Sequence, residues 1–148
     1  KPFTPDSSYR QRFFGPMRVV IGRFGSFHCP GGPEGNKTEY FDFKPGDLVF
    51  GRCYQSSKGM KLMSVGLDTS KYGCDGPPPD TWINDCFLLE SDNIYFLGSG
   101  MILVDAGDYD ADGESELLFW HHSFEFDGYE LIYNRLTQET AYFWENSF

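Results

Sequence analysis

Glycine and proline interrupt this chain so often that a long helix is not expected. The 148 residues include 17 Gly and 9 Pro, and no stretch keeps a sustained helical period. The runs between these breaks are short and rich in β-branched and aromatic side chains, which favour strands. The sequence therefore predicts an all-β fold of antiparallel strands, arranged as a sandwich, a barrel or a partial propeller-like meander.

The expected strands follow an irregular, proline-containing N-terminal arm at residues 1–16. They cover residues 17–27, 38–43, 48–54, 59–67, 82–89, 93–97, 101–105, 116–122, 129–134 and 140–144. Residues 44–47 (KPGD) place Pro and Gly where a type II turn requires them, which predicts a hairpin between two of these strands. Further turns are expected at residues 127–128 and 136–137, so that the last three strands form an antiparallel meander. The length of the chain suits one β domain over residues 17–148.

The formal net charge of −10 narrows the choice of partners. A surface of this sign repels phosphate backbones and anionic membranes, which argues against nucleic-acid binding and leaves metal cations and basic proteins as suitable ligands. No apolar run approaches the roughly 20 residues that a membrane-spanning helix needs, and no signal peptide is visible. We therefore expect no membrane insertion. Because the chain begins with Lys1 and not with Met, we interpret it as a mature or trimmed fragment.

The four cysteines predict an oxidising compartment. Cys29, Cys53, Cys74 and Cys86 include no C-x-x-C pair, which argues against a zinc ribbon. An even number of cysteines in a Gly- and Pro-rich β chain indicates two disulfides, and therefore a periplasmic or secreted protein. Three pairings are open. The stiff loop after Cys74 favours Cys74–Cys86, with Cys29–Cys53 as the second bridge, and four reduced, buried thiols are the alternative.

One loop carries a strong chemical motif. Residues 108–116 (DYDADGESE) contain three Asp at alternating positions, followed directly by Gly113. Calcium takes about six to eight oxygen ligands, and a loop supplies them from carboxylates at its first, third and fifth positions. Gly at the sixth position permits the sharp turn that wraps the chain around the ion. We therefore predict a Ca²⁺ site with side-chain ligands from Asp108, Asp110, Asp112 and Glu116 and a backbone carbonyl ligand from Glu114.

The predicted site is not an EF-hand. An EF-hand needs a bidentate carboxylate at the twelfth loop position, which is Phe119 here. The flanking segments are also typical of strands and not of helices. The motif is therefore a D-x-D-x-D-G calcium loop between two strands, and an acidic solvated turn without an ion is the alternative interpretation.

Three segments of the sequence resemble an FG-GAP or VCBS repeat: residues 96–98 (FLG), 105–113 (DAGDYDADG) and 116–119 (ELLF). Such repeats form blades of β-propellers, as in integrin α-subunits and many bacterial surface proteins, and bind calcium between two strands. The resemblance spans roughly Phe96–Trp120 and implies the same calcium ligands as the loop motif. It departs from the repeat at Ala111, where Gly is common, at Glu116, where Asp is usual, and in the Trp-His-His segment that follows the second strand.

A second copy of the loop is not visible, and a chain of this length is too short for a complete propeller. The repeat-like unit, at about residues 93–148, is therefore expected inside a different or truncated β architecture. The segment before it resembles no family that we can name.

Two other groups of residues suggest chemistry or binding. His121 and His122 are neighbours on an expected strand, and one of them can pair with Glu125 or Asp127 as an acid–base couple. Aromatic side chains crowd the C-terminal meander, where strand alternation places some in the core and some outside. A surface location of the histidines and a core location of most aromatics are the simpler interpretations.

These observations together predict a non-catalytic, calcium-binding β domain that binds another protein outside the cytosol. A periplasmic inhibitor or immunity protein is one concrete version of this hypothesis. An extracellular adhesion or carbohydrate-binding module is a second version, and a small calcium-dependent hydrolase is the rival hypothesis. We assign no catalytic residues.

Overall fold

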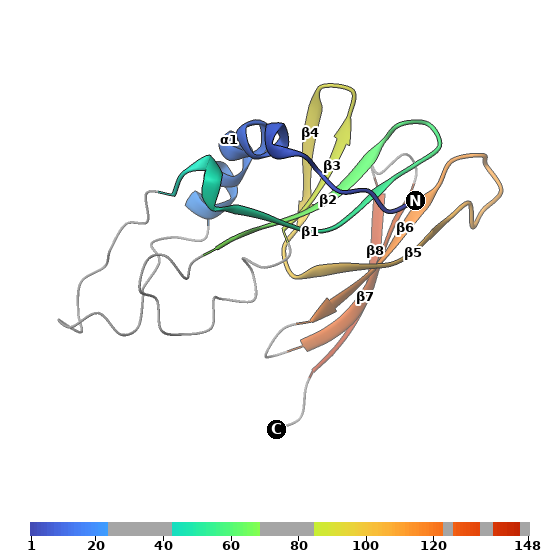
Figure 1. Ribbon diagram of the computed structural model, residues 1–148. Helices are drawn as coiled ribbons and strands as arrows, with labels where there is room; N and C mark the ends of the chain where they lie inside the picture. The colour runs from blue at the N-terminus through green and yellow to red at the C-terminus, as the bar shows by residue number, and fades with distance from the viewer. Residues whose placement is uncertain (24–42, 69–84, 123–125, 134–137, 146–148) are drawn as a thin grey trace. The chain divides into compact units, whose positions relative to one another are not determined.

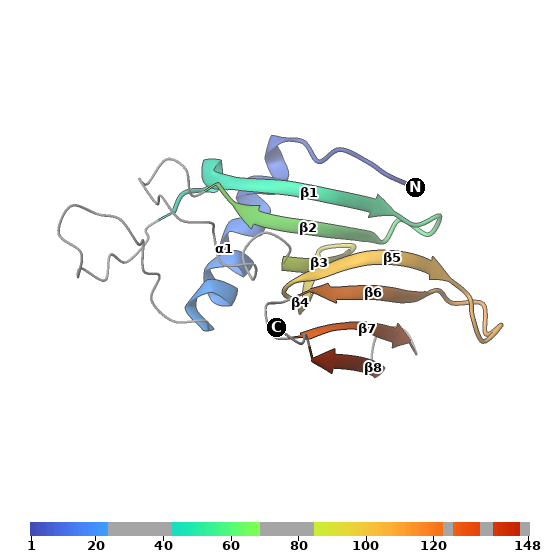
Figure 2. The ribbon, with the colours of Figure 1, turned by 90° about the horizontal axis from the view of Figure 1, so that it is seen from below.

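The described residues form one α-helix, one short 3-10 helix and two four-stranded antiparallel sheets (Figures 1 and 2). The computed structural model describes residues 1–23, 43–68, 85–122, 126–133 and 138–145. The predicted all-β class is confirmed, and neither sheet closes into a barrel among the described strands.

The chain groups into two compact units, each of which contains one sheet. The first unit is Lys1–Ser99 and the second unit is Gly100–Phe148. The expectation of one β domain over residues 17–148, with a repeat-like part from about residue 93, stays a prediction.

Helix α1 (Ser7–Arg23) lies where the sequence analysis expected an irregular arm and the start of a first strand. Both expectations are wrong over residues 7–23, whereas residues 1–6 are irregular as expected. The helix begins after Asp6, whose carboxylate accepts hydrogen bonds from the backbone N–H of Ser8 at 2.8 Å and from its hydroxyl at 2.5 Å. This cap satisfies a donor that the first helical turn leaves unpaired. The two bonds from Ser8, with the hydroxyl first, lower the pKa of Asp6.

A buried apolar stripe explains why this segment is a helix. Phe13, Met17 and Val20 stand at helical spacing and are almost completely buried, so the helix has one face to hide from water. The β-branched run at residues 19–21 and the internal Pro16 concealed this period in the sequence. Burial of the stripe outweighs both local preferences, because propensity is weak beside packing.

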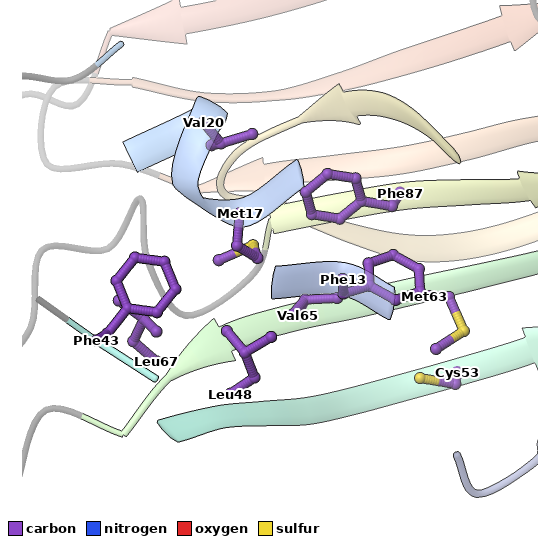
Figure 3. Close-up of a cluster of buried hydrophobic side chains, with 10 residues drawn as sticks. All are labelled: Phe13, Met17, Val20, Phe43, Leu48, Cys53, Met63, Val65, Leu67 and Phe87. Atoms are coloured by element: carbon purple, nitrogen blue, oxygen red, sulfur yellow. The ribbon is translucent and has the colours of Figure 1, made fainter. Parts of the chain in front are cut away.

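The first sheet packs against this stripe of α1 (Figure 3). Its strands, in spatial order, are β1 (Leu48–Gln55), β2 (Lys61–Leu67), β3 (Asp85–Glu90) and β4 (Asn93–Gly98). Cys53 lies opposite Met63, and Met63 lies opposite Phe87, so the three side chains share one face of the sheet. The ring of Phe13 stands edge-on to that of Phe87, with 5.5 Å between centroids. This face and the helix stripe form the core of the first unit.

The turn before β1 differs from the expected type. Helix η1 (Pro45–Asp47) is a 3-10 turn in which the N–H of Asp47 donates to the Lys44 carbonyl at 2.9 Å. The N–H of Lys44 donates in return to the Asp47 carboxylate at 2.8 Å. A type II turn needs a positive φ at Gly46, which Gly46 does not have. The strand expected before this turn falls mostly on residues 38–42, which lie outside the described residues, and β1 pairs with β2 instead.

The second sheet is an antiparallel meander of four strands, and its last three are the meander that the sequence predicted. Its strands, again in spatial order, are β5 (Met101–Gly107), β6 (Glu116–His122), β7 (Phe126–Tyr133) and β8 (Gln138–Glu145). The turn expected at Asp127-Gly128 is wrong, because both residues lie inside β7. Gly128 is needed there for space and not for a turn, because a Cβ at this position would overlap with the Phe143 ring. The turn expected at residues 136–137 lies outside the described residues.

The described cysteines are buried in the first unit and do not form a disulfide. Burial raises the pKa of the Cys86 thiol to about 12, and it also raises the pKa of Cys53. The structure therefore does not support the expected bridges Cys74–Cys86 and Cys29–Cys53. Cys29 and Cys74 lie outside the described residues.

Candidate metal centre

The predicted calcium loop connects β5 to β6 at one end of the second sheet. The strands close on the loop with Gly107 opposite Glu116. Two residues of the loop have backbone in the left-handed region, Ala111 with φ 63° and Gly113 with φ 87°. The glycine accepts this conformation easily, whereas alanine adopts it at a cost. The D-x-D-x-D-G spacing thus gives the sharp reversal that the sequence analysis expected at Gly113.

Loop carboxylates accept hydrogen bonds from loop N–H groups. The Asp108 carboxylate accepts from the N–H of Asp112 at 3.0 Å and from that of Gly113 at 3.0 Å. Asp110 accepts from the same Asp112 N–H at 3.1 Å. Acceptors that bond to successive N–H groups hold the chain in a tight coil. The acidic side chains therefore shape the loop from inside.

Three carboxylates of the loop converge on one point. Asp108, Asp110 and Glu116 each offer an oxygen, and these oxygens all lie within 4.8 Å of one another. Oxygens on opposite sides of a calcium ion are about 5 Å apart, because each Ca–O distance is about 2.3–2.6 Å. The arrangement therefore fits a shared calcium ion, although exposed acidic groups also gather without one.

Glu116 differs from the other two acids in burial. Asp108 and Asp110 are exposed, whereas Glu116 is only 3% exposed. Its carboxylate accepts a hydrogen bond from the N–H of Tyr109 at 2.5 Å, which ties the beginning of the loop to β6. A buried carboxylate is costly unless it is hydrogen-bonded, neutralised or bound to a cation.

Asp112 and Glu114 are not brought into this group. The Asp112 carboxylate instead accepts from the N–H of Glu114 at 2.8 Å. Their roles as ligands, by side chain and by carbonyl respectively, stay predictions.

Tyr109 is a loop residue to which the sequence analysis gave no role. Its ring lies beside Gly107, where an added Cβ would be 3.4 Å from a ring carbon. Its hydroxyl donates to the Asp105 carboxylate at 2.9 Å. Desolvation and then the bond to Asp105 raise the pKa of Tyr109. Asp105 is thus occupied outside the three-carboxylate group, as the alternation of β5 indicates.

Each histidine of β6 pairs with a carboxylate of β7. His122 Nδ1 lies 2.6 Å from an oxygen of Asp127, which is one of the two partners that the sequence analysis named. His121 Nε2 lies 2.5 Å from Glu130, a partner that it missed. The side chains of His121 and Glu130 are only 15% and 12% exposed. Glu125 lies outside the described residues.

A further acid is buried in the first unit. Asp85 is completely buried; the Ser99 hydroxyl donates to one carboxylate oxygen at 2.5 Å, and the other has no partner. Burial raises the pKa of Asp85 to about 6, although the bond from Ser99 opposes the shift. Sequence patterns did not indicate this residue, because nothing near Asp85 in the chain predicts burial of a carboxylate.

Comparisons with protein-family models, with curated proteins and with solved structures find no match to this chain. The resemblance to FG-GAP and VCBS repeats stays a hypothesis. No helix of the described residues is long and apolar enough to cross a membrane.

Proposed function

We propose that this protein is a non-catalytic, calcium-binding β protein that binds another protein outside the cytosol. The observation that carries the calcium part is the convergence of Asp108, Asp110 and Glu116. The carboxylates come from both ends of one loop, and the buried Glu116 is already held in place by the Tyr109 N–H. A cation between them would offset their mutual repulsion and would link β5 to β6.

Calcium in this proposal has a structural role. An ion that binds the folded chain and not the unfolded chain stabilises the fold by mass action, by about 2.7 kcal/mol at a hundredfold excess over its Kd. It would hold the end of the second sheet and so keep a binding surface in shape. A disulfide is not required for this role.

The protein-binding part rests on exposed aromatic side chains in the second sheet. Tyr129, Tyr142 and Trp144 are 43%, 71% and 37% exposed. Tyrosine and tryptophan are enriched in protein interfaces. The near-buried His121–Glu130 pair is a poor candidate for general acid–base catalysis, since a substrate needs access to it.

The test is thermal unfolding of EDTA-treated protein with and without calcium. With calcium at about a hundred times its Kd we expect the Tm to rise by roughly 5–10 °C. Asp110→Asn should abolish the rise, because it removes one of the three converging charges. Glu145→Gln, which removes an exposed acid of β8, should leave the rise intact. An equal response of all three proteins, or no response, would overturn the calcium proposal.

A further inference from the structure

The second sheet carries a connected aromatic surface, which we call the aromatic face. It consists of Trp120, Tyr129, Tyr142 and Trp144. The Trp120 ring contacts Tyr129 and Trp144, with centroids 4.9 and 5.5 Å apart. Trp144 also contacts Tyr129 and Tyr142, with centroids 6.1 and 6.0 Å apart. Four rings from three strands therefore form one cluster.

Strand register places the cluster on one side of the sheet. Trp120 lies opposite Tyr129, and Tyr129 lies opposite Tyr142, so the three form a row across β6, β7 and β8. Trp144 lies opposite Asp127 in the next row on the same side. The residues that alternate with them point to the other side, where Phe119 and Ile132 are buried and Phe143 is 44% exposed. The aromatic face therefore occupies one side of the sheet over β6, β7 and β8.

The rings do not form a flat platform. The planes of neighbouring rings meet at 68°, 59°, 50° and 42°. A sugar ring stacks best on an open, flat aromatic surface, whereas tilted rings expose faces at several angles. The negative potential of an aromatic face attracts ammonium and guanidinium groups that approach within about 6 Å. The geometry therefore favours a cationic ligand over a carbohydrate.

Charge distribution supports the same ligand. The second unit contains one Lys or Arg and 11 Asp or Glu, whereas the first unit contains 11 of each. The entire formal net charge of −10 therefore belongs to the second unit. Its one basic residue, Arg135, lies outside the described residues. A potential of one sign over so small a unit attracts partners of the opposite sign.

In the first unit, basic side chains form cation–π contacts with aromatic rings. Lys61 Nζ lies 5.6 Å from the centroid of Phe3 and 5.2 Å from that of Tyr9. The Arg18 guanidinium lies 5.6 Å from the centroid of Phe14. The described part of the second unit has neither Lys nor Arg to place over its aromatic face. A partner that carries Lys or Arg would bring the cations that this described part lacks.

Carboxylates stand on both sides of the aromatic row. Asp127 occupies the row with Trp144, and Asp105 lies opposite Leu118, in the row on the other side of Trp120. Successive rows on one side of a strand are about 7 Å apart, which is within reach of a long basic side chain. Asp127 is held by His122 and Asp105 by Tyr109, so both carboxylates are fixed in place.

We propose that the aromatic face binds an arginine- or lysine-rich segment of a partner protein, through cation–π contacts with the rings and ion pairs with the flanking carboxylates. The inference rests on the proposed protein-binding function and names the chemistry of the partner. It does not require a bound calcium ion.

The test is calorimetric titration of the full chain with an oligo-arginine peptide, with tryptophan fluorescence as a second readout. We expect binding that weakens as salt is added. Tyr142→Ser and Trp144→Ser should each weaken it by about tenfold. The matched control is Tyr95→Ser, which removes a 47% exposed tyrosine from β4 of the electrically neutral first unit. This control should bind as tightly as the native protein. Circular dichroism confirms that each variant is folded.

Two outcomes would overturn the inference. Equal binding by the native protein and both face variants would mean that the peptide senses only bulk acidity. No peptide binding would also exclude it, and binding of soluble cello- or xylo-oligosaccharides in its place would assign the face to carbohydrate. Parallel titrations in EDTA and in calcium separate this inference from the calcium proposal. Peptide binding without any calcium response would overturn only the calcium proposal. A calcium response without peptide binding would overturn only this inference.

Discussion

The two units of this chain are both built on four-stranded antiparallel sheets, but they treat their aromatic and acidic side chains in opposite ways. In the first unit, Phe13 and Phe87 are buried between α1 and the sheet, Lys61 lies beside Phe3, and acidic and basic residues are equal in number. In the second unit, aromatic rings reach the surface and acids dominate. The exposed rings and the excess of acids are the features on which the proposed partner binding rests, whereas the rings of the first unit's core contact the chain's own helix.

The largest effect should come from the core of the first unit. Phe13→Ala should lower the free energy of unfolding by about 3–5 kcal/mol, because it leaves a cavity where the ring meets Phe87. Tyr142→Ala, which truncates a 71% exposed ring, should change it by less than about 0.5 kcal/mol. Urea unfolding followed by circular dichroism measures both. Similar losses in the two variants would erase the proposed difference between the units.

A pH-dependent effect should come from the buried acid of the first unit. The pKa of Asp85 is raised from 3.8 to about 6 in the folded chain, so between these values the folded state binds more protons than the unfolded state. Stability therefore falls as pH rises through this window, by about 3 kcal/mol in all, and the loss is complete above pH 6. Asp85→Asn should remove this slope. The test compares the free energies of unfolding of the native protein and of Asp85→Asn at pH 4 and pH 8. An equal pH dependence in the two proteins would show that Asp85 does not cause it.

The smallest effect should come from backbone strain in the calcium loop. Ala111 has φ 63°, and Ala111→Gly should stabilise the protein by about 0.5–1 kcal/mol, because relief of strain slightly exceeds the added chain entropy. Gly113→Ala should destabilise it by a similar amount. A Cβ at Gly113 would meet no atom within 4 Å, so the loss would come from conformation alone. Thermal unfolding without calcium measures the change in stability of each variant. A change of the same sign in both variants would contradict the positive φ angles of the loop.

Sequence reasoning succeeded where local signals and the fold agree. The boundaries of β6 and the antiparallel order of β6, β7 and β8 were predicted from the sequence, and the spacing of the loop acids indicated Asp108, Asp110 and Glu116. The same reasoning failed at α1, where β-branched residues and Pro16 concealed a buried stripe. It also failed at residues 127–128, where Asp-Gly suggested a turn although Gly128 makes room for Phe143.

Other features were beyond the reach of local patterns because they depend on contacts across the fold. The His121–Glu130 pair forms only after β6 and β7 align, and the burial of Asp85 depends on the position of β3 within its sheet. The asymmetry of charge was present in the printed sequence. The boundary between Ser99 and Gly100 showed that the net negative charge belongs to one compact unit.

Strand β8 has a consequence for how copies of this protein meet in concentrated solution. It is an edge strand, and all eight of its residues are exposed, which makes it a template for pairing with itself. Antiparallel self-pairing centred on Tyr142 would place Glu139 of one copy against Glu145 of the other at both ends. Like charges directly opposite oppose such a pair. We infer that repulsion between the two glutamates disfavours this self-pairing. Light scattering should show self-association of the Glu139→Gln/Glu145→Gln protein at concentrations where the native chain stays monomeric.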